Sequence, residues 1–428
     1  MAEINTKQAS PLGWIASTWF AMGIPFIALS SSAAIMYQSF KLPDEEVAFW
    51  TSFILLPWAL KFLWAPLLEM FKNKKYFVYV SQFFLGVLFA LVAVSIISDR
   101  FFGLSIGLFT AIAVAAATQD LAADGIYINE LNKFQQQQFI GWQTVFSQLA
   151  KAIFGSALVL LAFQLEEVYG LKIAWMTVMI IYAIAMITHG VITVNKLPTG
   201  GDAVHAVDSA PEAIVIYRDV LLQFLKKKNL WIGLLFIFLY RLAEAQVVKI
   251  APFFFKASRI DGGLGIDKAD TSFIFGVVGT IAFVLGSLAS GYFVASKTFN
   301  RKTLLTLCAI MNIPLLVYSY LAITQPVDEL PIILMVAFQQ FCYGFGLLAL
   351  VYYILQEIVP GRYQLAYFSF AAAAMNFAFI IPGMFSGYLS DYMGYYEFFI
   401  WVIICTVPAF IMSATVPLTN ATDSSTAN

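Results

Sequence analysis

Long apolar runs separated by short polar breaks dominate the 428-residue chain. A helix that spans a bilayer needs about 20 mostly apolar residues, and the chain holds twelve runs of this kind. We therefore predict transmembrane helices over residues 12–38, 46–68, 76–98, 101–131, 139–164, 173–195, 230–256, 270–295, 303–324, 331–357, 365–390 and 395–416. The one long polar interruption separates six helices from six, which indicates a two-fold repeat.

The composition agrees with a membrane protein, since 61% of the residues are hydrophobic and 11% are charged. Soluble domains are about 45–50% apolar and about 25% charged, so this excludes a soluble enzyme, a nucleic-acid-binding protein and a disordered scaffold. The three cysteines are isolated within apolar runs and have neither disulfide nor metal-ligand spacing. We therefore expect no disulfide framework, no metal site and no cofactor.

The polar interruption and the basic residues predict the domain organisation and the orientation. We expect an N-terminal half at 1–195, a linker at 196–229, a C-terminal half at 230–416 and a tail at 417–428. With the N-terminus inside, more than twice as many Lys and Arg residues lie in inner segments as in outer loops, as the positive-inside rule requires. Both termini are then cytoplasmic. The compact loops favour a multi-pass protein of the cell inner membrane. Apolar residues at helical spacing before Lys226 predict an amphipathic linker helix on the inner membrane surface.

Two short inner loops are basic and stand at the same place in the two halves. The residues that define them are Glu69, Lys72, Lys74 and Lys75 in the first loop and Lys297, Arg301 and Lys302 in the second. These loops resemble the loop signature of the major facilitator superfamily. The resemblance implies an all-α integral membrane fold of two six-helix pseudo-repeats, in which these loops take part in the conformational change.

Seven charged residues fall inside the predicted spans, where a charge is costly unless it meets a partner or a water-filled cavity. They are Lys61, Asp120, Asp124, Lys151, Arg241, Glu244 and Lys249. A helical rise of about 1.5 Å per residue puts several of them near the middle of the bilayer. We expect Asp120 to pair with Lys151 across consecutive helices and Asp124 to have no evident partner. Arg241 and Glu244 share a helix face at i, i+3. Ion pairs that only hold helices together are the alternative.

The seven charges sum to +1, which favours an anionic or zwitterionic solute carried together with a proton. A proton carrier must be a carboxylate whose ionisation responds to burial and neighbours. Asp124 is the first candidate, followed by Asp120 and Glu244. Lys61, Lys151, Arg241 and Lys249 are candidates for substrate binding. Polar residues inside the spans either line the path or hydrogen-bond helix to helix, and these are Gln119, Gln148, Gln339, Gln340, Tyr343 and Asn376.

Two stretches, 56–67 and 117–125, resemble a narrower group, the peptide/acetyl-CoA transporter family that includes muropeptide permeases. The first has Pro57-x-x-x-Lys61 before Phe-Leu-Trp-Ala-Pro, and the second has Gln119-Asp120-x-x-x-Asp124. The resemblance implies proton-driven import of an amino-sugar that carries a peptide, with Lys61, Asp120 and Asp124 in the family's functional positions.

Several alternatives to muropeptide import stay open. Another anionic solute is one, such as an acidic or amino-sugar oligosaccharide or a CoA ester. A membrane-embedded enzyme would need a nucleophile–base pair or a metal cluster, and the sequence offers neither, so we expect a transporter and no enzyme. The expected partners are a small-molecule substrate, protons and membrane lipids, with no nucleic acid, and the protein is expected to be a monomer.

Overall fold

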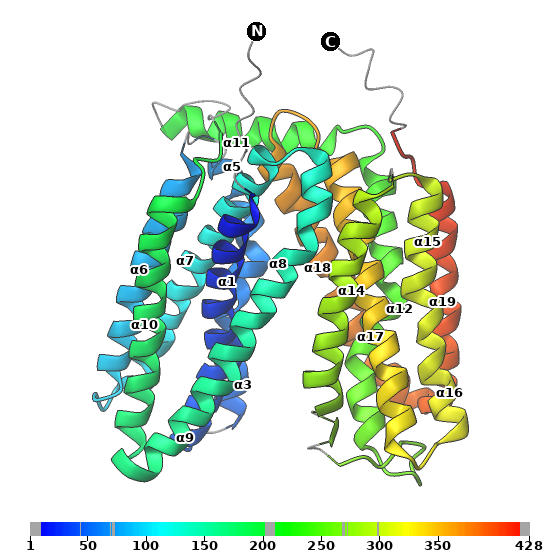
Figure 1. The fold of residues 1–428 in the computed structure, drawn as a ribbon, viewed down its shortest axis with the longest axis horizontal. Coiled ribbons are helices and arrows are strands. Elements are labelled where there is room, and N and C mark those ends of the chain that lie inside the picture. The colour runs from blue at the N-terminus through cyan, green and yellow to red at the C-terminus, as the bar shows by residue number, and fades with distance from the viewer. Residues whose placement is uncertain are drawn as a thin grey trace. The chain divides into compact units, whose positions relative to one another are not determined.

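The structure is a computed structural model that describes residues 10–42, 44–68, 70, 73–201, 210–267, 270–271, 273–297 and 299–419. All regular elements in these ranges are helices (Figure 1). Eleven helical segments are long and apolar enough to cross a membrane. The predicted all-α membrane fold is therefore confirmed, with one exception at 46–68.

The chain separates into two compact units. Unit 1 contains residues 1–61, 71–131 and 142–203, and unit 2 contains residues 62–70, 132–141 and 204–428. The segments 62–70 and 132–141 lie within the predicted N-terminal half, yet their contacts belong to unit 2. Two elements, η2 (Lys61–Leu63) and α8 (Lys133–Lys151), run from one unit into the other.

Unit 1 is a bundle in which α6 packs against both α7 and α10. Its elements are α1 (Leu12–Ile27), η1 (Ala28–Ser32), α2 (Ala33–Ser39), α3 (Asp44–Phe53), α4 (Leu56–Leu60), α6 (Lys74–Ser95), α7 (Phe101–Glu130), η3 (Ala152–Ala157), α9 (Leu158–Tyr169) and α10 (Leu171–Lys196). Its core includes Phe89, Phe109 and Trp175, all fully buried. Tyr182 joins this core and exchanges a 2.9 Å hydrogen bond with Ser32 of η1. The π-helical turn η1 follows Pro25, whose ring removes a backbone donor from α1.

The predicted single helix over 46–68 is wrong, because the segment is broken into α3, α4, η2 and α5 (Ala65–Leu68). The cause is in the sequence, since Pro57 and Pro66 cannot donate to the carbonyls four residues before them. The chain therefore leaves α-helical geometry near Phe53 and again at the 3₁₀ turn η2. This break determines the position of Lys61, which is the first residue of that turn.

Unit 2 is a second bundle, built on the pairs α12–α18, α12–α19 and α14–α17. Its remaining elements complete the list: α11 (Ala210–Leu225), α12 (Leu230–Lys256), η4 (Phe273–Gly279), α14 (Thr280–Ala295), α15 (Arg301–Asn312), η5 (Ile313–Leu315), α16 (Leu316–Thr324), α17 (Glu329–Tyr353), η6 (Ile354–Ile358), α18 (Gln364–Met393) and α19 (Tyr395–Thr415). Helices α14 and α17 cross very closely. A Cβ at Gly286 would lie 1.9 Å from the Phe341 carbonyl oxygen, and one at Gly344 would lie 2.1 Å from the Phe283 oxygen.

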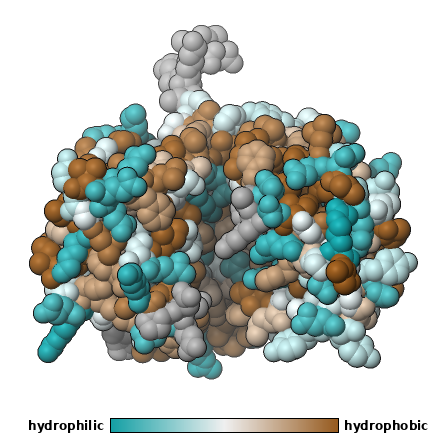
Figure 2. All heavy atoms as spheres, turned by 90° about the horizontal axis from the view of Figure 1, so that it is seen from below, coloured by the Kyte–Doolittle hydropathy of each residue, from teal (hydrophilic) through white to brown (hydrophobic). Residues whose placement is uncertain are grey.

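Large apolar side chains also cover the outside of the helices. Phe49, Leu160 and Ile281 are each more than half exposed, and hydrophobic residues reach the outer rim among hydrophilic ones in the end-on view (Figure 2). Such a surface is unstable in water and suits lipid acyl chains. A helix, α11, is present within the predicted linker, and in the sequence it lies between the last span of unit 1 and the first long span of unit 2.

Candidate functional site: two buried charge clusters

The charge cluster of unit 1 is built on Lys61. Asp120 and Asp124 stand one turn apart on one face of α7, and the Lys61 ammonium contacts an Oδ2 atom of each. The contact to Asp120 is the closer one, and the contact to Asp124 is 3.4 Å long. The three side chains are only 12–18% exposed. One ammonium therefore serves two carboxylates inside an apolar bundle.

The expected Asp120–Lys151 ion pair is wrong, and so is the expectation that Asp124 lacks a partner. Lys61 forms ion pairs with both Asp120 and Asp124, because the 3₁₀ turn η2 places its side chain beside α7. Lys151 instead places its Nζ 4.6 Å from the centre of the Phe26 ring, a cation–π arrangement. It still interacts electrostatically with Asp120. The four charges Lys61, Lys151, Asp120 and Asp124 sum to zero.

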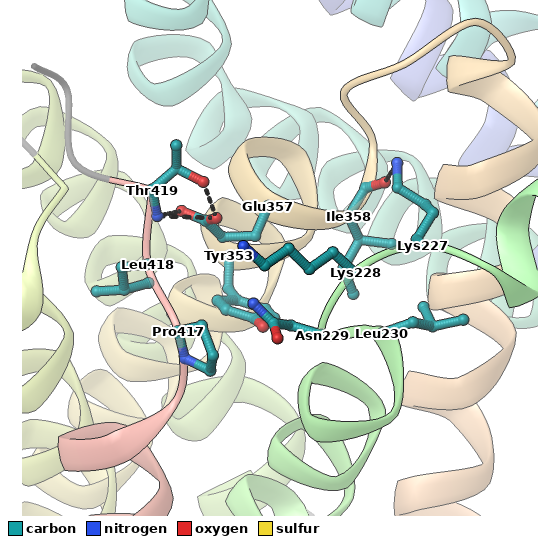
Figure 3. A pocket seen from close by; sticks show the side chains of 10 residues that line it. All are labelled: Lys227, Lys228, Asn229, Leu230, Tyr353, Glu357, Ile358, Pro417, Leu418 and Thr419. Atoms are coloured by element: carbon teal, nitrogen blue, oxygen red, sulfur yellow. Dashed lines mark hydrogen bonds between the residues drawn. The ribbon is translucent and has the colours of Figure 1, made fainter. Parts of the chain in front are cut away.

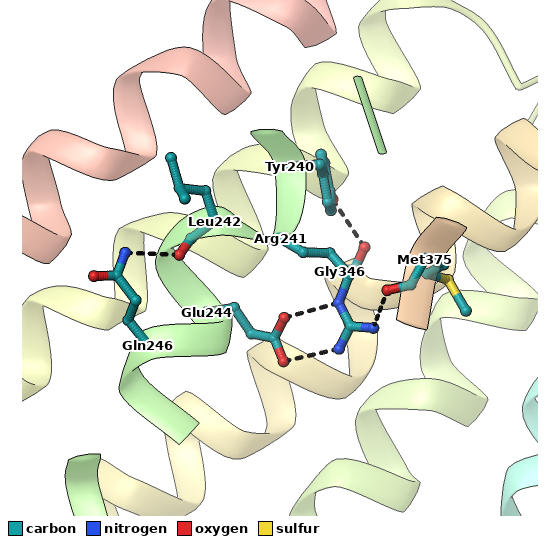
Figure 4. Close-up of polar contacts among 7 residues, drawn as sticks. All are labelled: Tyr240, Arg241, Leu242, Glu244, Gln246, Gly346 and Met375. Atoms are coloured by element: carbon teal, nitrogen blue, oxygen red, sulfur yellow. Dashed lines mark hydrogen bonds and ion pairs between the residues drawn. The ribbon is translucent and has the colours of Figure 1, made fainter. Parts of the chain in front are cut away.

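The charge cluster of unit 2 is a closed pair on α12 (Figure 4). Arg241 Nε donates to Glu244 Oε2 at 3.0 Å and Nη2 donates to Oε1 at 3.1 Å. Arg241 Nη1 also donates to the Met375 carbonyl of α18 at 3.2 Å. The Phe379 ring lies 4.7 Å from the guanidinium carbon, and Tyr343 interacts with both members of the pair. The predicted shared face of Arg241 and Glu244 is thus confirmed.

The remaining substrate-binding candidates fall into different environments. Lys249 and Asn376 are exposed, whereas Gln148 and Gln340 are half-buried. Gln339 is buried and accepts a 3.0 Å hydrogen bond from the Tyr318 hydroxyl, which accounts for it as a helix–helix contact.

Gln119 is the most unusual of the polar candidates. It is fully buried beside Asp120, and neither atom of its amide has a hydrogen-bond partner within the described ranges. Gln82 of α6 has the same property, although no sequence pattern distinguishes it.

Most of the described residues of the two basic loops have packing roles. Lys74 is fully buried as the first residue of α6, so it is no surface loop residue. The Lys75 amide donates to the Thr199 carbonyl. Arg301 Nη1 donates to the Ser413 carbonyl at the end of α19, where a cation stabilises the helix dipole. Lys297 lies over the Phe293 ring and Lys302 is exposed. Glu69 and Lys72 lie outside the described residues.

One pocket in unit 2 is absent from the sequence-based predictions. Its volume is about 500 Å³, and its walls come from three segments that lie far apart in the chain: Lys227–Leu230, Tyr353 with Glu357 and Ile358, and Pro417–Thr419 (Figure 3). Lys227 Nζ donates to the carbonyls of Ile358 and Pro360 at 2.5 and 2.6 Å. Burial lowers the pKa of the Lys227 ammonium from 10.5 to about 8. The only sequence signal was the run Lys226–Lys228.

Comparison with known proteins agrees with this architecture. The "Sugar (and other) transporter" family model matches residues 209–425. The chain is 25% identical over 413 residues to the "Putative transporter AmpG 4" of Rickettsia felis, covering 91% of this chain and 92% of that one. It is 22% identical over 403 residues to the "Anhydromuropeptide permease" of Escherichia coli K12, covering 92% and 77%.

A solved structure shares the fold. The "Major Facilitator Superfamily (MFS) transporter, FucP, in the outward conformation" superposes with a TM-score of 0.69 at 15% identity, over 96% of this chain and 99% of that chain. The matching family model and the shared helical fold agree with the resemblance that the two basic loops indicated. The chain belongs to the sugar (and other) transporter family, and its fold is that of a solved major facilitator superfamily transporter.

Proposed function

We propose that this transporter is a proton-coupled symporter that imports an anionic, amino-sugar-containing solute such as anhydromuropeptide. It acts by alternating access, as a monomer in the cell inner membrane with both termini in the cytoplasm. The observation that carries the proposal is the shared ammonium of Lys61, which contacts both Asp120 and Asp124.

Charge balance explains why this cluster suits proton coupling. Lys61, Lys151, Asp120 and Asp124 are neutral in sum, which keeps the cost of burial low in an apolar bundle. A proton taken up by either carboxylate leaves the cluster with a charge of +1. A bound anion restores neutrality, so the proton and the anion favour each other's binding, which is the linkage that a symporter needs. Each ligand alone leaves an unbalanced charge in the membrane.

Asp124 is the carboxylate that we assign to the proton. Its contact with Lys61 is 3.4 Å long, and Asp120 holds the same ammonium more closely while Lys151 adds a second positive field. The carboxylate that nearby positive charges stabilise less is protonated at a smaller cost in free energy. Asp120 is then the residue that keeps Lys61 in place.

The relatives support the class of substrate. An anhydromuropeptide permease aligns with 92% of this chain. Within unit 1, Lys61 and Lys151 offer cations for an anionic solute. Another anionic solute, such as an acidic oligosaccharide or a CoA ester, is the second candidate, because cations recognise any of these anions by the same electrostatics.

The proposal is tested with purified protein in liposomes. We expect an inward proton gradient to drive accumulation of radiolabelled anhydromuropeptide above the external concentration, and a protonophore to abolish the accumulation. Accumulation of an acidic oligosaccharide but not of the muropeptide would replace the substrate and keep the mechanism. Equilibration without accumulation for every anion tested would contradict the proposed proton coupling.

A further inference from the structure

The pocket at the start of α12 lies where several membrane spans end. Helix α12 begins at Leu230, η6 ends at Ile358 and α19 ends at Thr415. Leu230 and Ile358 line the pocket, and the third wall segment begins at Pro417, two residues after α19. Helix ends mark the level at which the apolar core of a bilayer gives way to headgroups. A volume of about 500 Å³ at this level is large enough for a lipid headgroup.

The pocket is amphipathic. Leu230, Ile358, Pro417 and Leu418 form apolar walls, and Lys228, Asn229, Tyr353 and Glu357 supply polar groups. In the close-up of Figure 3 the Lys228 side chain runs across the pocket. A cavity with an apolar wall and a cation fits a ligand with the same two parts.

The charges of the pocket favour an anion. Lys227 and Lys228 are both in the wall, and Lys227 is already held by two backbone carbonyls. Glu357 is the one carboxylate of the wall, and its oxygens accept hydrogen bonds from the Thr419 amide and hydroxyl at 2.6–3.0 Å. Those bonds hold the Glu357 carboxylate in place but leave its charge, so two lysines and one carboxylate give the wall a net charge of +1.

Helix α11, which ends three residues before Lys228, points to a lipid as the source of the anion. One face of α11 packs against the rest of unit 2, with Val220 and Phe224 buried and Asp219 accepting a hydrogen bond from the Tyr363 hydroxyl. The opposite face exposes Ile214 and Val215 at 71% and 67% of their surface. Leu221, Leu222 and Leu225 are also exposed. An exposed apolar face next to lysines is the pattern that binds anionic membrane surfaces.

We infer that this pocket binds the phosphate group of an acidic phospholipid. The Lys228 ammonium pairs with the phosphate, the polar edge around Asn229 hydrogen-bonds the headgroup, and the Pro417–Thr419 segment forms the lid. Acyl chains extend along the apolar surface near α11. A free phosphate ion offers the same charge chemistry, but it would leave the apolar walls uncovered.

Native mass spectrometry of the purified full-length protein in detergent tests this site with two lipids, phosphatidylglycerol and phosphatidylethanolamine. We expect the wild type to retain phosphatidylglycerol preferentially. Lys228→Gln should lower the retained phosphatidylglycerol about five-fold, the effect of about 1 kcal/mol per basic residue at a membrane surface. Lys226→Gln is the matched control, because Lys226 is exposed on the same segment but does not line the pocket, and it should change retention little.

The lid is tested by truncation. Removing residues 417–428 should lower retention as Lys228→Gln does, whereas removing only 420–428 keeps the Thr419–Glu357 bonds and should have no effect. Melting temperatures near that of the wild type show that the variants fold. Competition by inorganic phosphate at millimolar concentration would identify a free-phosphate site with the same chemistry. Equal retention of both lipids, or equal loss in Lys226→Gln and Lys228→Gln, would overturn the inference.

Discussion

Lys61 Nζ lies 3.4 Å from Asp124 Oδ2 while the same ammonium holds Asp120 more closely. A single cation thus connects two carboxylates one turn apart on α7. The cation comes from a 3₁₀ turn between two proline-broken helices, an arrangement in which a small backbone shift changes the distance to each carboxylate. Protonation of Asp124 would release Lys61 from one of its two partners.

Removal of the shared cation should be costly. In Lys61→Met the two carboxylates lose their ion pair, and breaking a buried pair from one side costs about 3–5 kcal/mol. We expect a lower melting temperature in detergent and loss of proton-driven uptake. Lys61→Arg keeps the charge and is the control, which should retain most of the stability. A Lys61→Met protein as stable as the wild type would show that the cluster is solvated.

The Arg241–Glu244 pair should behave as one unit. Either Arg241→Met or Glu244→Met leaves a buried unpaired charge, so each should cost about 3–5 kcal/mol of unfolding free energy. The double variant Arg241→Met/Glu244→Met removes both charges and should cost less than the sum by about 1–3 kcal/mol. Thermal unfolding of the four proteins measures this coupling. Additive costs would mean that the two side chains act independently.

The α14–α17 crossing should tolerate no side chain at Gly286. A Cβ there would lie 1.9 Å from the Phe341 carbonyl oxygen, so Gly286→Ala should force the helices apart and cost about 1–3 kcal/mol. Gly276→Ala on the same span is the control, because no atom lies within 4 Å of its Cβ position. Melting temperatures compare the two. A fall of equal size in both variants would assign the effect to helix propensity.

The pH response of the linker helix follows from Lys227. Its pKa of about 8 lies below the ordinary 10.5, so between these values docked α11 binds fewer protons than undocked α11. Docking should therefore strengthen as pH rises from 8 to 10.5 and stay constant below 8. Competitive acylation read by mass spectrometry should give a half-maximal Lys227 reactivity near pH 8. A midpoint near 10.5 would show that its ammonium is solvated.

Most of the fold was predictable because spanning helices are determined by local composition. Eleven predicted spans are found as helices, and α9 extends to Tyr169 where the prediction ends at residue 164. The exception is residues 46–68. The long apolar run predicted one continuous helix there, although Pro57 and Pro66 break it. Local backbone geometry there decides where Lys61 points.

The sequence analysis named the residues of the unit 1 charge cluster but paired them incorrectly. The i, i+4 spacing of Asp120 and Asp124 puts both on one face of a helix, but the consecutive order of the helices suggested Lys151 as the partner of Asp120. The true partner, Lys61, depends on a 3₁₀ turn that no periodic pattern predicts. The pocket at Lys228 was missed because its walls come from three segments more than 50 residues apart, and such a meeting requires the tertiary structure.

The most direct test of proton coupling at Asp124 compares two assays of Asp124→Asn in liposomes. Proton-driven accumulation of labelled anhydromuropeptide should fall about ten-fold or more, the loss of at least about 1.4 kcal/mol of coupling free energy. Exchange of internal for external substrate needs no net proton movement and should persist. Accumulation at the wild-type level in Asp124→Asn would contradict the account and move the proton to Asp120 or Glu244.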